Sequence, residues 1–182
     1  IECRRLFPCF DQPDLKAKFT VSATAPKTWK VIANSKCTSS VAHGQDLTLH
    51  TFEPTPVIST YLFALIAGPY TQFDDVYDGR LPLGLFCRQS LAKYIDTPEL
   101  FEITKNGLKY YETFFDCKFP FSKYDQIFCP EFNQGAMENV GAVTFYEGYI
   151  FRDPATESAR SNRADTILHE MAHMWFGNLV TP

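Results

Sequence analysis

The sequence predicts an α+β protein in which a β-rich first part precedes a part that mixes strands and helices. Short runs of alternating apolar and polar residues dominate up to about residue 72. Beyond that point, two stretches repeat their apolar residues with a helical period. The chain has 182 residues, 45% of them hydrophobic, which is enough for one ordinary domain or for parts of two and excludes a disordered chain.

The first part is expected to contain four strands. Residues 19–25, 29–33 and 47–52 alternate in polarity, which is typical of half-buried strands, and the segments between them carry Asn, Ser and Gly turn residues. Residues 61–67 are continuously apolar and are followed by Gly68-Pro69, which predicts a fully buried strand.

The second part is expected to begin with a strand at residues 83–88. Thr97-Pro98-Glu99 then has the chemistry of a helix start, with Thr97 as N-cap, and the apolar period extends this helix to about Phe115. Residues 124–129 and 142–146 predict strands that flank a Gly-containing loop. A second helix is predicted from Thr156 to Phe176, with Gly177 as its stop.

The boundary between the two parts is predicted between Tyr70 and Leu81, where aspartates and a glycine gather. We therefore expect one domain at residues 1–74 and a second at 75–182. The segment that opens the chain has no apolar stretch after its arginines and is not a signal peptide. Because the chain also lacks an initiator Met, both of its ends are expected to be cuts in a longer chain.

Composition excludes some classes of partner. A net charge of −4 argues against binding to nucleic acid. The longest apolar run, residues 61–67, is far too short to cross a membrane. Six cysteines at irregular spacing, none in a C-x-x-C pair, favour free thiols, and hence a cytoplasmic location, over a disulfide framework.

The motif that carries the chemistry is His169-Glu170-Met171-Ala172-His173, an H-E-x-x-H sequence inside the second predicted helix. Residues four apart lie on one face of a helix, so both imidazoles can bind one zinc ion. Glu170 is displaced by about 100° around the axis. It can therefore act as the general base that takes a proton from the attacking water in a hydrolase.

The alternative is a pair of histidines satisfied within the core. The apolar surface of the predicted helix favours zinc, because two imidazoles and a carboxylate in a buried helix need a compensating charge. A hydrolytic zinc site needs a third protein ligand. Phe176 and the absence of any later His exclude a metzincin pattern, and His43 and His50 are expected at the surface. The third ligand is therefore expected beyond Pro182.

A second group, Gly135-Ala136-Met137-Glu138-Asn139, lies in the predicted loop between the last two strands. Gly135 would let a backbone approach closely, and a peptide could pair with this stretch as an added strand. Glu138 could hold the free α-ammonium group of a peptide, which would make the protein an exopeptidase. The alternative is a solvated turn residue.

Taken with H-E-x-x-H, the G-A-M-E-N sequence resembles the zinc aminopeptidases of the aminopeptidase N family, which includes alanyl and puromycin-sensitive aminopeptidases. Three further stretches resemble this family: FPCFDQP from Phe7, FALIAGPY from Phe63 and HMWFGNLVT from His173. The resemblance spans essentially the whole chain. It implies the end of an N-terminal β-sheet domain followed by the first part of a thermolysin-like zinc peptidase domain.

The resemblance also implies roles for individual residues. His169 and His173 would bind zinc, Glu170 would activate water, and Glu138 would anchor the substrate N-terminus. The neighbours of Glu138 would line the substrate channel or, for the asparagine, support the loop: Gly135, Ala136, Met137 and Asn139. The family's third zinc ligand and its transition-state tyrosine would lie beyond Pro182, and a second ammonium-binding glutamate would lie just before Ile1.

Three functions follow as alternatives. The favoured one is an aminopeptidase that removes N-terminal residues from peptides, with the present chain inactive on its own because key groups lie outside it. A second is a non-catalytic chain that binds peptides. A third is a bifunctional enzyme like leukotriene hydrolase, against which Ala136 speaks, because that branch typically has Gly there.

Overall fold

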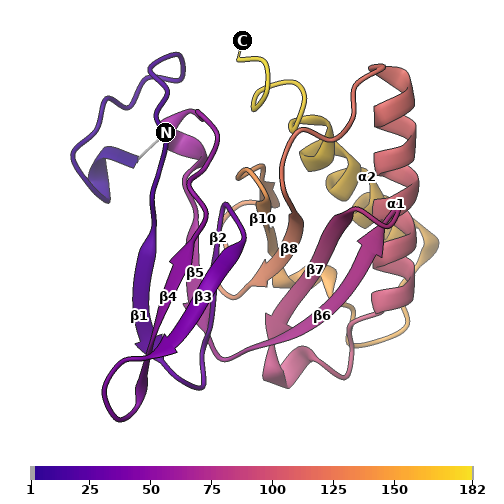
Figure 1. Cartoon of the computed structure of the whole chain (residues 1–182). Helices are drawn as coiled ribbons and strands as arrows, with labels where there is room; N and C mark the ends of the chain where they lie inside the picture. Colours follow the sequence, from indigo (N-terminus) through magenta and orange to yellow (C-terminus); the bar gives the residue numbers. More distant parts are fainter. Residues whose placement is uncertain (1–2, 182) are drawn as a thin grey trace.

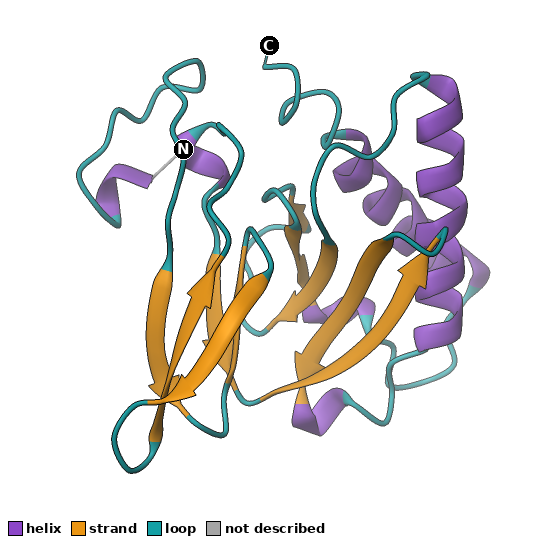
Figure 2. Cartoon of the chain, viewed as in Figure 1, coloured by secondary structure: helices purple, strands orange, loops and turns teal. Residues whose placement is uncertain are grey.

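The computed structural model describes residues 3–181 and contains three β-sheets and two α-helices, which confirms the α+β class (Figures 1 and 2). A three-stranded sheet has the order β1-β4-β3, a two-stranded sheet pairs β2 with β5, and a five-stranded sheet has the order β6-β7-β8-β10-β9. In chain order, the strands and α-helices are β1 (Ser22–Pro26), β2 (Lys30–Ala33), β3 (Cys37–Ala42), β4 (Leu47–Phe52), β5 (Leu65–Gly68), β6 (Tyr70–Tyr77), β7 (Leu81–Arg88), α1 (Thr97–Phe114), β8 (Tyr124–Cys129), β9 (Ala136–Met137), β10 (Ala142–Tyr146) and α2 (Glu157–Ala172).

The first part is β-rich, as predicted, but its last apolar run is not one strand. Residues 60–62 form a short 3₁₀-helix (η2), and only β5 continues as a strand, antiparallel to β2. Burial explains the difference, since Leu62 and Ala64 are buried whereas Leu65 is 44% exposed. An apolar run marks burial but does not distinguish a strand from a helical turn.

The predicted boundary between residues 74 and 75 falls inside β6, which pairs antiparallel with β7 along its whole length. Asp78, one of the aspartates on which the predicted boundary rests, lies in the turn of this hairpin. Asp78 and Gly79 have φ values of 52° and 63°, and the Arg80 N–H donates to the Tyr77 carbonyl at 3.1 Å. Positive φ at both central residues is the pattern of a type I′ hairpin turn. The division into domains 1–74 and 75–182 remains a prediction.

The five-stranded sheet is the middle of three layers. Leu85, Phe128 and Val143 point to the face that α1 and α2 cover, whereas their strand neighbours Phe86 and Ile127 pack with Ile32 of β2. Figure 1 shows both helices together on one side of this sheet. Because both faces are covered, β8 and β10 are almost continuously buried, as expected of parallel strands between two layers.

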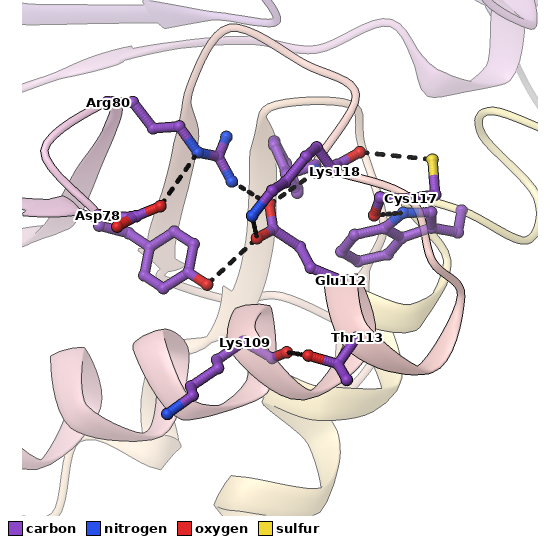
Figure 3. Close-up of polar contacts among 10 residues, drawn as sticks. Asp78, Arg80, Lys109, Glu112, Thr113, Cys117 and Lys118 are labelled. Carbon is purple, nitrogen blue, oxygen red and sulfur yellow. Dashed lines mark hydrogen bonds and ion pairs between the residues drawn. The ribbon is translucent and has the colours of Figure 1, made fainter.

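Helix α1 starts at Thr97, the residue predicted as its cap, and the cap lies one residue earlier, because the Asp96 side chain accepts from the Glu99 N–H. Near its other end, the buried Glu112 carboxylate accepts from the Phe119 N–H at 2.8 Å and from Tyr77, and pairs with Arg80 and Lys118 (Figure 3). Burial alone would raise the pKa of Glu112, but the Phe119 hydrogen bond and the two cations lower it below its usual value. This carboxylate therefore ties α1 to the β6–β7 hairpin and to the loop before β8.

Helix α2 ends at Ala172, not at Phe176 as predicted. The Thr156 side chain caps its start, and His173 is its C-cap residue. The following residues turn back on the helix end, with Gly177 at φ 119°.

All six cysteines are unpaired, as predicted, and the cytoplasmic location expected from them remains a prediction. Among the described residues, no helix is both long enough and apolar enough to cross a membrane.

Candidate zinc and substrate site

The two histidines of H-E-x-x-H aim at one point. Their Nε2 atoms are 3.2 Å apart and their ring centroids 4.8 Å apart. Two ligand atoms at the tetrahedral angle, each about 2.05 Å from a zinc ion, are themselves separated by about 3.3 Å. The distance between His169 and His173 therefore fits two ligands of a common zinc ion.

The hydrogen bond at the other nitrogen of His173 favours the same use. His173 Nδ1 lies 3.0 Å from the Phe176 carbonyl oxygen, which can only accept a hydrogen bond. Nδ1 therefore carries the proton and, in the neutral ring, Nε2 keeps a lone pair that faces His169. A carbonyl that orients a histidine in this way is the usual outer partner of a metal ligand.

Glu170 lies between these histidines in the sequence but in a different environment. It is 6% exposed, whereas His169 is exposed and His173 half-buried. Burial, and secondly the charge of Glu138, raise the pKa of Glu170 to about 7, against a lowering effect of His173. A carboxyl group that titrates near neutral pH is suited to general base catalysis.

Glu138 reaches the same place from the edge of the five-stranded sheet. Ligand atoms of Glu138, Glu170 and His173 all lie within 4.8 Å of one another. The structure therefore brings together residues that are more than thirty positions apart in the sequence. Two carboxylates beside two imidazoles form a site for cations, and both a metal ion and an ammonium group satisfy that description.

The sequence predicts a loop for the whole G-A-M-E-N segment, but part of this segment is a strand. Ala136 and Met137 form β9, which pairs antiparallel with Phe145 and Thr144 of β10. β9 is the last strand of its sheet, and no other strand of the described residues pairs with its outer edge. That edge can therefore accept an added strand.

The other two members of that sequence lie at the two ends of β9. Gly135 is exposed, and its carbonyl accepts from the Tyr146 N–H at 2.9 Å. The buried Asn139 donates to the Thr144 hydroxyl at 3.1 Å. Asn139 therefore fastens the segment after Glu138 to β10.

Tyr61 is a site residue that the sequence did not indicate. Burial, followed by the charge of the nearby Glu138 carboxylate, raises the pKa of Tyr61. Tyr61 lies in η2, within the run predicted as a strand. Only the packing of η2 beside β9 brings it to Glu138, so no local signal could have identified it.

The remaining histidines take no part in the site. His43 is exposed, and His50 in β4 lies 3.0 Å from the Ser40 hydroxyl on β3. His43 lies at the surface, as predicted, whereas His50 is half-buried. The second glutamate expected just before Ile1 lies outside the described residues.

Comparison with known proteins identifies the family of the chain. Residues 99–182 match the Peptidase family M1 domain, and residues 1–62 match the Peptidase M1 N-terminal domain. The chain is 50% identical over 183 aligned residues to Aminopeptidase N of Streptomyces lividans, 36% identical to Aminopeptidase N of Bos taurus and 34% identical to Glutamyl aminopeptidase of Homo sapiens. Each alignment covers 99% of this chain but only 19–21% of the relative.

The chain thus spans about a fifth of the length of these relatives. Its two matches fall in the order that the sequence predicted, an N-terminal domain followed by the start of a peptidase domain. This chain belongs to the M1 peptidase family, as part of an aminopeptidase N-type protein.

Proposed function

We propose that the full-length protein containing this chain is a zinc aminopeptidase that removes single residues from the N-terminus of peptides. The observation that carries the proposal is the grouping of Glu170 and His173, at the end of α2, with Glu138 from the sheet edge, while His169 lies next to His173. The names of the relatives support the reaction class.

Members of this family are generally zinc-dependent, and in this chain His169 and His173 would hold the ion through Nε2. Bound zinc would supply Lewis-acid chemistry, polarising water and the scissile carbonyl. Glu170 takes the proton of the attacking water and later delivers it to the leaving amine, for which a pKa near neutrality is suited. A third ligand is expected outside this chain.

Glu138 supplies the exopeptidase character. Its carboxylate would pair with the α-ammonium group of the substrate, and the partly buried Tyr61 lies near it. The free edge of β9 would bind the substrate backbone as an added strand. A peptide whose N-terminus is blocked could not complete this charge pair and would leave Glu138 unpaired.

The experiment uses the full-length protein with a matched pair of fluorogenic aminoacyl substrates, one free and one N-acetylated. We expect turnover of the free substrate only, its loss on treatment with 1,10-phenanthroline, and its recovery on addition of zinc. Equal turnover of the acetylated substrate would contradict the role of Glu138. Unchanged turnover in zinc-free, chelator-treated protein would contradict the zinc mechanism.

A further inference from the structure

The segment that carries Glu138 leaves the sheet between β9 and β10. The ladder pairs Met137 with Thr144 and stops there, so the carbonyls of Glu138 and Val140 have no strand partner. Each accepts instead from a buried asparagine side chain. Asn178 Nδ2 donates to the Glu138 carbonyl at 2.8 Å, and Asn34 Nδ2 donates to the Val140 carbonyl at 2.9 Å.

Asn178 connects this segment to the histidine helix. It is 2% exposed and lies in the turn after α2, where its own N–H donates to the His173 carbonyl at 3.0 Å. One residue is therefore bonded at its backbone to His173 and at its side chain to Glu138. Asn178 sets the spacing between a predicted zinc ligand and the carboxylate predicted to bind the substrate N-terminus.

Asn34 connects the same segment to the first part of the chain. It is 3% exposed, directly follows β2, and makes three hydrogen bonds of 2.8–2.9 Å: to the carbonyls of Leu62 and Val140, and from the Ala64 N–H. Leu62 is adjacent to Tyr61, whose pKa is raised by burial and by the charge of the nearby Glu138 carboxylate. Asn34 thus joins the segment that follows Glu138 to the segment that follows Tyr61.

The backbone is shaped for this contact. Gly141 has a φ of +65°, and a Cβ there would lie 2.4 Å from the Asn34 carbonyl oxygen. Only glycine allows the two segments to approach so closely. The contact joins residues 106 positions apart, between parts of the chain that match two different domains of the family.

We propose that Asn34 and Asn178 are positioning residues that hold Glu138 in register with the histidine pair, so that the site recognises an α-ammonium group and the metal-binding group of one ligand together. The inference rests on the proposed function and adds to it the residues that align Glu138 with the histidine pair. Neither asparagine touches the substrate; both act through Glu138.

The test measures amine recognition separately from metal binding in the full-length protein. The probes are L-leucine hydroxamate and 4-methylpentanohydroxamic acid, which is the same molecule without the α-amine. The inhibition constant of the des-amino compound divided by that of L-leucine hydroxamate reports the contribution of the amine. This ratio does not depend on the fraction of enzyme that is folded. We expect this ratio to fall about three- to tenfold in Asn178→Ala and in Asn34→Asp, with the inhibition constant of the des-amino compound and the zinc content unchanged.

Asn34→Asp is chosen because it keeps an oxygen for the Ala64 N–H while losing the amide donors. The matched control is Asn106→Ala, an exposed asparagine of α1, which should leave the ratio unchanged. In a Glu138→Ala background, Asn178→Ala should have no further effect on the ratio, because residues that act as one unit are not additive.

The outcomes separate the two proposals. A wild-type protein that binds both hydroxamates equally would contradict the role of Glu138 and with it the proposed function. If the wild type discriminates and Glu138→Ala does not, an unchanged ratio in Asn178→Ala and Asn34→Asp overturns only the positioning role. An equal rise of both inhibition constants in those variants also overturns it, because it would indicate a general loss of structure.

Discussion

Glu170 and the histidines beside it show how one turn of helix can hold groups in different environments. The imidazoles lie toward the open side of α2, whereas Glu170 is buried next to Tyr124, a fully buried tyrosine whose pKa is raised by burial and by the charge of Glu170. A buried carboxyl group beside the reacting water has a high proton affinity, and a buried phenol does not compete for that proton. The proposed general base is therefore more shielded from solvent than the two histidines beside it.

We predict that Glu170→Gln in the full-length protein lowers kcat at least about 10²-fold, because glutamine keeps the shape of the side chain but cannot accept the proton. Zinc content should stay at the wild-type value, since both imidazoles remain. The measurement is turnover of an aminoacyl reporter together with metal analysis of the same sample. Loss of zinc in parallel with activity would show instead that Glu170 is needed to hold the ion.

At the scale of elements, the Glu112 carboxylate joins α1 to the β6–β7 hairpin and to the loop before β8 (Figure 3). Its pKa is lower in the folded protein than its ordinary value, so the folded state gains stability from its ionisation. This contribution is present above the pKa of the unfolded chain, about 4.3, and is lost as the pH falls through the lower folded pKa.

We predict that Glu112→Gln destabilises the protein at pH 7 by about 1–3 kcal/mol, because Arg80 and Lys118 lose a charged partner. The amide oxygen of the glutamine can still accept the hydrogen bond from the Phe119 N–H. Thermal unfolding at pH 7 and at pH 3.5 checks the sign: the gap between variant and wild type should narrow in acid. Glu102→Gln on the exposed side of α1 is the control. A gap that widens in acid would contradict the lowered pKa.

Several elements could be predicted from local sequence, and the failures have physical causes. β8 and β10 match the predicted residues 124–129 and 142–146, because β-branched and aromatic runs between turns leave few alternatives. The second helix ends at Ala172 because residues 173–180 fold back on its last turn, a tertiary contact that the apolar period cannot show. The pair Asp78-Gly79 contributed to the predicted domain boundary, although an Asp-Gly pair is one of the strongest hairpin signals.

The residues of the candidate site also divide into those that local sequence identifies and those that only tertiary packing brings together. His169, Glu170 and His173 could be identified because their spacing of one turn is itself the geometry of the site. Tyr61 and Asn34 could not, because Tyr61 comes near Glu138, and Asn34 contacts Val140, only through the packing of the first part of the chain against the second. Buried polar contacts between distant positions leave no local pattern.

At the scale of the whole molecule, the site lies where the two parts of the chain meet. Ile58 and Leu62 of the first part form a small apolar cluster with Val140 of the second, and Tyr61 and Met137 pack against it. The helices on the opposite face of the five-stranded sheet belong to a separate and larger core. Helix α2 packs in the larger core, whereas the segment before Glu138 packs against both, with Ala136 on the larger core and Met137 on the small cluster. The position of Glu138 relative to the histidines therefore depends on the contacts between the two parts.

That dependence leads to a prediction for residues 1–182 produced alone. Two imidazoles provide fewer ligands than the three that a hydrolytic zinc site needs, and Glu138 and Glu170 have other roles to fill. We predict that the isolated chain binds zinc at least about a hundredfold more weakly than the full-length protein and releases no product from an aminoacyl reporter. Zinc titration against a chromophoric chelator, with circular dichroism to establish that the isolated chain is folded, checks both statements. Tight binding of one zinc ion per folded chain would mean that a third ligand lies among these residues. Glu138, which has a carboxylate oxygen within 4.8 Å of a ring nitrogen of His173, would then be the candidate, and its assignment to the substrate N-terminus would be wrong.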